Sequence, residues 1–240
     1  MLGLTTVQEY VAYVQEHSEE IERILDVLTI HVTEFFRDSA VFETLAQRVF
    51  PWIIDKKLSE NSRTIRIWSA GCATGEEAYS IAMHLMDRLR REKADCGIQI
   101  FGTDISEESC RIAKRCLYTE KRLSDVPRRF RKWFFEAAEG GYTVSPEIRR
   151  CVKFEVHDLF TAPPFSKLDL IFCRNVLIHF DQNARNRVIF NFHSALGEDG
   201  ILVLGKSEAV AGAGHEMFEL MDPKNKIYRK TARCACDKEA

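Results

Sequence analysis

Three short segments place polar or acidic side chains directly after apolar runs. Residues 69–77 (SAGCATGEE) follow the first run, residues 102–104 (GTD) end the second, and residues 173–175 (CRN) end the fourth. Apolar runs separated by helical periods are typical of parallel strands covered on both faces. In such sheets ligands bind at the carboxyl ends of the strands, near the point where the strand order reverses. We therefore expect the three segments to meet at one ligand-binding edge.

The residue types at this edge favour a cationic nucleoside. Gly71 and Gly75 let the backbone turn sharply before a helix, and Glu76 in the first helical turn would attract an ammonium group and repel a pyrophosphate. Asp104 could accept hydrogen bonds from ribose hydroxyls. The G-x-G-x-x-G spacing of dinucleotide sites is not present. The pattern indicates S-adenosylmethionine rather than NAD or ATP, although Glu76 could simply stabilise the helix dipole and Asp104 could simply cap the following helix.

The remaining pattern predicts an α/β protein with a doubly wound, mostly parallel sheet and an antiparallel C-terminal hairpin. Apolar runs predict strands over residues 65–70, 98–103, 152–156, 168–173 and 201–205, and helical periods cover 76–90, 106–116 and 181–196. Residues 218–221 and 226–230 form the hairpin. Before residue 50, Thr6 and Glu9 have capping-box spacing, a second amphipathic helix includes residues 21–28, and Asp38 could cap a third.

The chain organisation follows from these elements. We expect an N-terminal helical region over 1–50, an α/β domain built on the predicted sheet over 51–232 and a polar tail over 233–240. A small β-subdomain is expected within the second part, at about 133–151, where Gly140-Gly141 separates two short segments. Cys234 and Cys236 lie in the tail, and a single C-x-C pair is weak evidence for a metal, so we expect none.

Composition bounds the function. The 240 residues carry 34 basic and 36 acidic side chains, for a net charge of −2, which argues against a general nucleic-acid binder. No apolar run is long enough to span a membrane, and scattered cysteines suit reduced thiols, so we expect a cytoplasmic protein. Charge is uneven: residues 1–30 have a net charge of −5 and residues 111–150 a net charge of +6. The basic stretch is either a solvated helical face or a docking surface for an acidic partner.

Several motifs together resemble the CheR family, the chemoreceptor glutamate methyltransferases of chemotaxis. The motifs are TEFFR at 33–37, IWSAGCATGEE at 67–77 and FCRNVLI at 172–178, with GTD at 102–104 and GKSE at 205–208 in the family order. The resemblance covers essentially residues 1–230. It implies a Rossmann-like methyltransferase sheet, an inserted β-subdomain, and transfer of a methyl group from S-adenosylmethionine to a receptor glutamate, with S-adenosylhomocysteine as product.

The resemblance also assigns roles to individual positions. It places Thr33 and Arg37 over the cofactor, Glu76 at its methionyl ammonium and Asp104 at its ribose. Beyond these, it implies further cofactor-site positions at His31, Gly71, Asp158, Leu159, Cys173, Arg174 and Asn175. Asp158 and the Leu159 N–H would meet the adenine, whereas Cys173 could equally be a buried small hydrophobe.

Two positions are expected to act in catalysis. Arg37 can hold the incoming carboxylate or the cofactor's own carboxylate through a bidentate fork. His179 stands where relatives usually have a tyrosine, and its ring could touch substrate or merely fill space; His31 replaces a common asparagine. Since a glutamate carboxylate is ionised at neutral pH, the chemistry calls for no general base and no metal.

The partner implied by the resemblance is the cytoplasmic domain of a methyl-accepting chemotaxis receptor. The insert loop at 139–142 is shorter than in members that tether to a receptor's C-terminal pentapeptide, so we expect no such tether. Two alternatives stay open at this point. The protein could methylate another protein or small-molecule carboxylate, or it could bind S-adenosylmethionine and signal without turnover.

Overall fold

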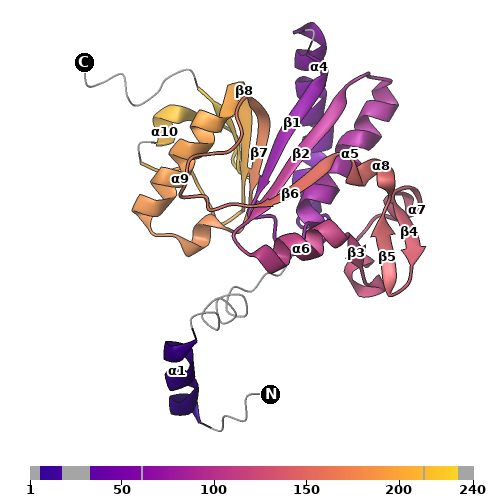
Figure 1. Cartoon of the computed structure of the whole chain (residues 1–240). Coiled ribbons are helices and arrows are strands. Elements are labelled where there is room, and N and C mark those ends of the chain that lie inside the picture. The colour runs from indigo at the N-terminus through magenta and orange to yellow at the C-terminus, as the bar shows by residue number, and fades with distance from the viewer. Residues whose placement is uncertain (1–5, 18–32, 61, 213, 232–240) are drawn as a thin grey trace. The chain divides into compact units, whose positions relative to one another are not determined.

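The computed structural model describes residues 6–17, 33–60, 62–212 and 214–231, which fall in two units divided before Thr33 (Figure 1). In the first unit, α1 (Val7–Glu16) begins at a capping box. Thr6 Oγ1 accepts a hydrogen bond from the Glu9 N–H at 3.2 Å, and Glu9 Oε2 accepts one from the Thr6 N–H at 3.0 Å. The predicted helix start is therefore confirmed. The helix predicted over 21–28 lies outside the described residues.

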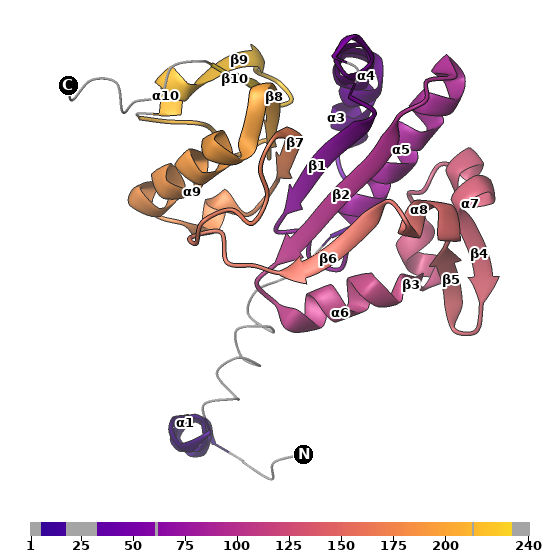
Figure 2. The same ribbon diagram turned by 45° about the horizontal axis from the view of Figure 1, so that its top comes forward.

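The second unit is built on a seven-stranded sheet with the order β6-β2-β1-β7-β8-β10-β9 (Figure 2). The parallel strands are β1 (Thr64–Ala70), β2 (Gly97–Asp104), β6 (Val152–Val156), β7 (Leu168–Cys173) and β8 (Leu196–Leu204). β9 (Phe218–Asp222) and β10 (Ile227–Lys230) form an antiparallel hairpin beside β8. The predicted α/β fold class is confirmed. The strand order reverses between β1 and β7, so the carboxyl ends of these two strands define the switch point.

Helices cover both faces of this sheet. In β7, Leu170 and Phe172 join the core on one face, whereas Ile171 and Cys173 join the core on the other. Figure 2 shows α3 (Ser39–Thr44), α4 (Phe50–Ser59) and α5 (Glu76–Glu92) on one side and α9 (Gln182–Ala195) on the opposite side. Burial on both faces explains why the strand segments are apolar throughout rather than alternating.

Shorter helices complete the second unit. A π-helical turn (Leu45–Val49) joins α3 to α4, and α10 (Gly214–Met217) precedes the terminal hairpin. α6 (Glu107–Arg115) follows β2, and the Tyr79 hydroxyl on α5 donates to the Ala113 carbonyl on α6 at 3.0 Å. No helix among the described residues has both the length and the apolar character needed to cross a bilayer.

A second, three-stranded sheet lies between β2 and β6 in the sequence. Its order is β3-β5-β4, with β3 (Leu117–Tyr118), β4 (Phe135–Ala138) and β5 (Gly141–Val144), and it is accompanied by α7 (Arg128–Phe134) and α8 (Pro146–Arg149). The expected hairpin around Gly140 is present, and β3 is an additional strand. Phe35 packs edge-on against Tyr118 at 4.9 Å and Phe135 at 5.3 Å between ring centroids. This contact fixes the segment that carries Arg37 beside the small sheet.

Asp38 stands at the N-terminal cap position of α3, as predicted. Its backbone is left-handed (φ +59°), and its side chain makes no capping hydrogen bond. The Asp38 carboxylate instead pairs with Arg174 and Lys206. Two cations attract the carboxylate more strongly than the partial charge of a six-residue helix does.

Candidate functional site

The loop between β1 and α5 joins the carboxyl ends of three strands. The N–H groups of Gly71 and Cys72 both donate to the Thr103 carbonyl at the end of β2, at 2.8 and 2.9 Å. Gly71 has φ +71° and Gly75 has φ +94°, and a Cβ on Gly71 would collide with Val176 in the loop after β7. The three motif segments therefore meet at one edge, and glycine is needed because of both the backbone conformation and the close approach.

Asp104 ties this loop to the start of α6. Its Oδ2 accepts from the Ala73 N–H at 2.8 Å and its Oδ1 accepts from the Ser106 N–H at 3.0 Å. The side-chain cap of α6 is Ser106, whose hydroxyl accepts from the Ser109 N–H, so Asp104 is not that cap. Each oxygen of an ionised carboxylate can accept a second hydrogen bond. Asp104 is therefore positioned by the backbone and keeps capacity for hydroxyl donors.

Two exposed apolar side chains flank Asp104, and sequence reasoning missed both. Ile105 is 68% exposed and Val156 is 53% exposed, and Val156 is the register partner of Asp104 on β6. Apolar side chains beside a few fixed polar groups are the usual lining of a small-molecule site. The available signal was the position of Ile105 directly after the acid that ends β2.

Asp158 and Leu159 follow β6 in a closed turn. Asp158 Oδ1 accepts from the Phe160 N–H at 2.9 Å. Leu159 is buried, and its carbonyl accepts from the Asn191 side-chain amide at 2.9 Å. These bonds hold the two residues in one conformation on the α9 side of the edge. Contact of either residue with an adenine stays a prediction.

Glu76 is a buried carboxylate at the first turn of α5. It has no exposed surface; Thr74 Oγ1 donates to its Oε2 at 2.7 Å, and Arg122 forms an ion pair with its Oε1. Burial raises the pKa of Glu76, whereas the Thr74 hydroxyl and the Arg122 guanidinium lower it. A carboxylate in this setting needs a cation beside it to stay ionised.

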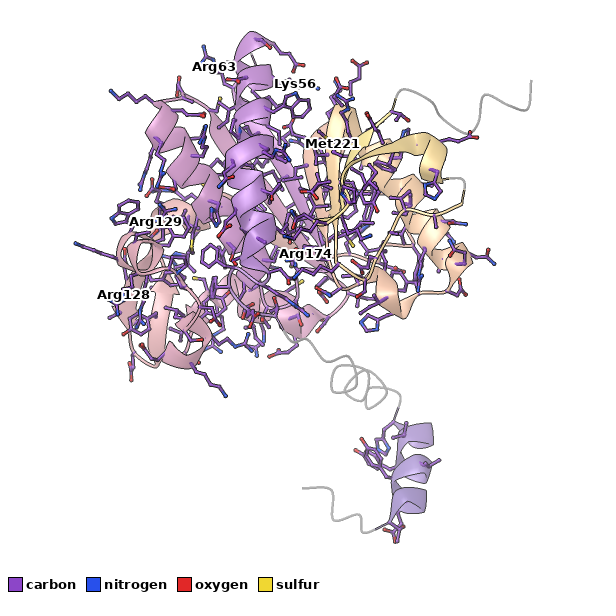
Figure 3. The ribbon with its side chains drawn as sticks, turned by 180° about the vertical axis from the view of Figure 1, so that it is seen from behind. Lys56, Arg63, Arg128, Arg129, Arg174 and Met221 are labelled. Atoms are coloured by element: carbon purple, nitrogen blue, oxygen red, sulfur yellow. The ribbon has the colours of Figure 1, made fainter. Side chains whose placement is uncertain are left out.

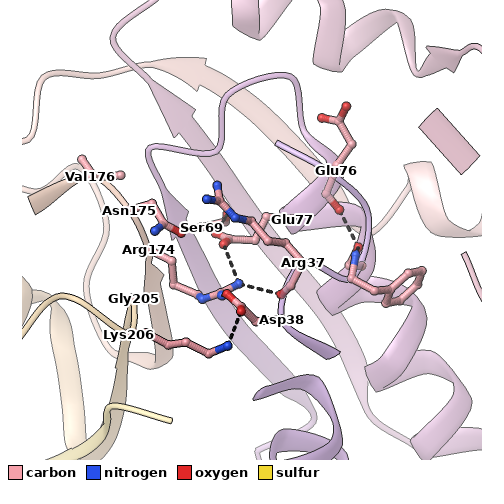
Figure 4. A network of polar contacts seen from close by, with 12 residues as sticks. Arg37, Asp38, Ser69, Glu76, Glu77, Arg174, Asn175, Val176, Gly205 and Lys206 are labelled. Carbon is pink, nitrogen blue, oxygen red and sulfur yellow. Dashed lines mark hydrogen bonds and ion pairs between the residues drawn. The ribbon is translucent and has the colours of Figure 1, made fainter. Parts of the chain in front are cut away.

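Arg37 lies in a network of polar contacts with residues of the loops after β1 and β7 (Figure 4). The buried guanidinium of Arg174 donates to the Arg37 carbonyl at 3.0 Å and pairs with the Asp38 carboxylate, which also accepts from Lys206. Phe36 and Asp38, on either side of Arg37, both have positive φ. Such strained residues persist when their surroundings over-determine them. The network therefore fixes the backbone from which the Arg37 side chain projects.

Glu77 is the second buried acid of α5 and faces this network. Ser69 Oγ donates to its Oε1 at 2.9 Å, and Arg174 Nη1 lies 3.8 Å from its Oε2. Burial raises the pKa of Glu77 to about 7, while Arg174 and Ser69 oppose that rise. Sequence reasoning quoted Glu77 within the motif without giving it a role.

The raised pKa of Glu77 predicts a pH-dependent stability. The folded chain holds this proton between about pH 4.5 and 7, where the unfolded chain releases it, so stability falls as the pH rises through that window. Glu77→Gln should remove this contribution. The difference in free energy of unfolding, variant minus wild type, should therefore be about 3 kcal/mol larger at pH 7 than at pH 4.5. Urea unfolding at a series of pH values measures it, with exposed Glu139→Gln as the control; a difference independent of pH contradicts the assignment.

The loop after β7 is held by an acid that sequence reasoning quoted only as part of a motif. Glu208 is buried, and its Oε2 accepts from the N–H groups of Gly205 at 2.6 Å and Asn175 at 3.0 Å. Its Oε1 accepts from the N–H groups of Val176 at 2.8 Å and Ile178 at 3.3 Å. Four donors on one carboxylate fix the path of the chain from Arg174 to His179.

The other predicted residues are less closely connected. Cys173 is buried in the core, where burial raises the pKa of its thiol, in keeping with a packing role. His179 has an exposed ring in a turn of 3₁₀ helix (Leu177–His179), and Thr33 is half-buried at the start of the second unit. His31 lies outside the described residues. Within the described ranges, no group of three or more His, Cys, Asp or Glu side chains suits a metal ion.

Relatives of the chain identify its family. Residues 31–227 match the family model described as CheR methyltransferase, SAM binding domain. A chemotaxis protein methyltransferase from Borreliella burgdorferi is 34% identical over 215 residues, which are 88% of this chain and 76% of that protein. An uncharacterized 104.1 kDa protein from Rhodobacter capsulatus is 33% identical over 231 residues, 95% of this chain, and this chain spans 24% of its length.

One solved structure also aligns with part of the chain. A TehB-like SAM-dependent methyltransferase from Corynebacterium glutamicum aligns with a TM-score of 0.42 at 18% identity, covering 80% of this chain and 97% of that one. The predicted family and the predicted cofactor are confirmed by the family match. The chain belongs to the CheR methyltransferase family, and residues 31–227 are its S-adenosylmethionine-binding domain.

Proposed function

We propose that the protein transfers the methyl group of S-adenosylmethionine to the side-chain carboxylate of glutamate in chemoreceptor cytoplasmic domains. The products are a glutamate methyl ester and S-adenosylhomocysteine. The observation that carries this proposal is the family match over residues 31–227, which the chemotaxis methyltransferases among its relatives support. The proposal places the enzyme in the cytoplasm, beside the receptor domain that it modifies, with no nucleic-acid partner and no insertion into the membrane.

The residues at the sheet edge fit this cofactor. The buried Glu76 carboxylate suits the methionyl ammonium, and the Asp104 carboxylate, fixed by two backbone N–H groups, suits the ribose hydroxyls. The exposed side chains of Ile105 and Val156 offer apolar surface for the adenine ring of the cofactor. When bound, S-adenosylmethionine supplies a methyl group activated by its sulfonium sulfur.

The protein's part in the reaction is alignment. The substrate carboxylate has an ordinary pKa near ~4.3 and is already a nucleophile at neutral pH. One of its oxygens forms a bond to the methyl carbon as the carbon–sulfur bond breaks, so no proton moves. Arg37 holds the carboxylate in line, and the Arg174–Asp38 ion pair fixes the backbone that carries Arg37. Alignment of this kind provides up to ~7–11 kcal/mol of rate enhancement.

The basic segment over residues 111–132 supplies a docking face for an acidic receptor helix. Four of its arginines are paired within the protein: Arg111 with Glu108, Arg122 with Glu76, Arg129 with Asp87 and Arg131 with Glu120. Five exposed cations have no ion pair among the described residues: Lys114, Arg115, Lys121, Arg128 and Lys132. Arg128 and Arg129 lie together on this side of the molecule (Figure 3). Unpaired surface charge of one sign steers an oppositely charged partner.

Transfer of radiolabelled methyl groups to purified receptor cytoplasmic domains tests the proposal. We expect label on the receptor that is released as methanol in base, as an ester requires. Label on another protein or on a small molecule would favour the other-carboxylate alternative, and S-adenosylhomocysteine binding without any transfer would favour a sensing module. We also propose that docking needs no C-terminal pentapeptide tether; binding of a receptor C-terminal peptide to this protein would overturn that part.

A further inference from the structure

Arg122 reaches the cofactor edge from the segment between β3 and α7, within the part of the chain that forms the small sheet. It lies in a turn of 3₁₀ helix (Glu120–Leu123) that buried Leu123 anchors. Its side chain is 42% exposed, although its tip contacts the fully buried Glu76 carboxylate. The tip donates to Thr74 Oγ1 at 2.9 Å and pairs with Glu76 Oε1. An exposed side chain can withdraw from such a contact without disturbing the core.

The carboxylate that Arg122 contacts is fully enclosed. One Glu76 oxygen receives the Thr74 hydroxyl and the other receives Arg122. The Tyr118 hydroxyl, on β3 of the small sheet, donates to the Thr74 carbonyl at 2.8 Å and so holds Thr74 beside Glu76. A buried carboxylate that loses its cation pays a large desolvation cost. Arg122 is the ion-pair partner that the described residues give to Glu76.

An ammonium group at Glu76 would share one buried carboxylate with Arg122. Oε2 already accepts from Thr74, and Oε1 is the atom that Arg122 contacts. Two cations at one buried carboxylate, which carries a single negative charge, repel each other strongly at low effective dielectric. The Arg122 ion pair and an ammonium ion pair are therefore alternatives for one site, and each supplies the positive charge that Glu76 needs.

We propose that Arg122 stands in for the methionyl ammonium at Glu76 and is displaced into solvent when S-adenosylmethionine binds. The inference rests on the proposed contact between Glu76 and the ammonium. It assigns Arg122 a part in cofactor binding instead of a place on the docking face. The exchange keeps Glu76 ionised throughout, and the cofactor must break the arginine contact before it can form its own.

Titration of Arg122→Gln with two ligands tests the exchange. S-adenosylhomocysteine carries the ammonium, and 5′-methylthioadenosine lacks the whole amino-acid part. Because the variant has no arginine contact to break, its Kd for S-adenosylhomocysteine should be about tenfold lower than that of wild type, which is about 1.4 kcal/mol. Its Kd for 5′-methylthioadenosine should change less than twofold. Arg128→Gln, an equal loss of charge in the same basic segment, should change neither value.

Several results would overturn the inference. Unchanged affinity for S-adenosylhomocysteine would show that Arg122 does not compete, and weaker binding would mean that it holds the ligand's carboxylate instead. An equal gain for both ligands would indicate a general opening of the site. If wild type binds no S-adenosylhomocysteine at all, the assignment of Glu76 fails and not merely the role of Arg122. Should Arg122→Gln not fold, Arg122→Lys keeps the charge without the planar fork and should give a smaller gain for S-adenosylhomocysteine alone.

Discussion

Replacing Arg37 by alanine should lower kcat/KM for methyl transfer by about 10²–10³-fold while leaving the fold intact. A group that holds a charged reactant at the reacting centre is worth about this much, through charge-assisted hydrogen bonds and alignment. The fold should survive because the segment is anchored by its neighbours. Phe35 is buried against Tyr118 and Phe135 of the small sheet, and the Phe36 N–H donates to Ser80 Oγ at 3.0 Å.

Circular dichroism and thermal unfolding check the fold, and initial rates of labelled methyl transfer to a receptor domain check the activity. Arg37→Lys keeps the charge but cannot form the fork, so it should recover only part of the rate. The matched control is Arg187→Ala, which removes an exposed arginine from α9 and should leave the rate unchanged. The Kd for S-adenosylhomocysteine separates the two uses of Arg37: no change assigns it to the substrate carboxylate, and weaker binding assigns it to the cofactor's carboxylate. Near-normal transfer by Arg37→Ala would contradict the assignment altogether.

Local patterns predicted most of the main sheet and its ligand edge. Parallel strands buried on both faces are continuous apolar runs, and glycine is required where β1 turns into α5, so both features leave a mark in neighbouring residues. Glu76 and Asp104 could be found because each directly follows such a feature. The same logic predicted the capping box at Thr6 and Glu9, whose two bonds span three residues.

Contacts between distant segments could not be predicted in this way. Arg122 lies 46 residues from Glu76, and Arg174 lies 136 residues from Asp38. Nothing near Asp38 in the sequence indicates two cations, so its position before a helix could be predicted but the ion pairs of its side chain could not. β3 has only two residues, too few to show a periodic pattern, and it pairs with β5, which follows α7 and β4 in the sequence. The charge network around Arg37 is thus a product of the fold, although its arginine was identified from the motif.

Glu208 is the clearest example of a contact between distant segments that the sequence did not predict, and we expect its substitution to have a large effect on stability and on methyl transfer. Its carboxylate accepts four backbone N–H groups, three of them in the loop that carries Arg174 and His179. Glu208→Gln keeps the shape but turns an amide N–H₂ toward these donors, and a buried donor without a partner costs about 1–3 kcal/mol. We expect the free energy of unfolding to fall by about 2–4 kcal/mol. Methyl transfer should fall at least about 100-fold, since small displacements of positioning residues have effects of that size.

Amide hydrogen exchange distinguishes a loosened loop from a general loss of stability. Protection should fall at Asn175, Val176 and Ile178 in Glu208→Gln while the centre of β1 stays protected, because the clamp acts on the loop and not on the sheet. Glu219→Gln is the matched control: it removes the same charge from an exposed ion pair with Arg229, where such pairs contribute about 0–1 kcal/mol. Equal effects of the two substitutions, or full activity in Glu208→Gln, would show that the loop keeps its path without the clamp. Loss of loop protection together with loss of transfer would instead show that an acid outside the cofactor site holds the catalytic loop in place.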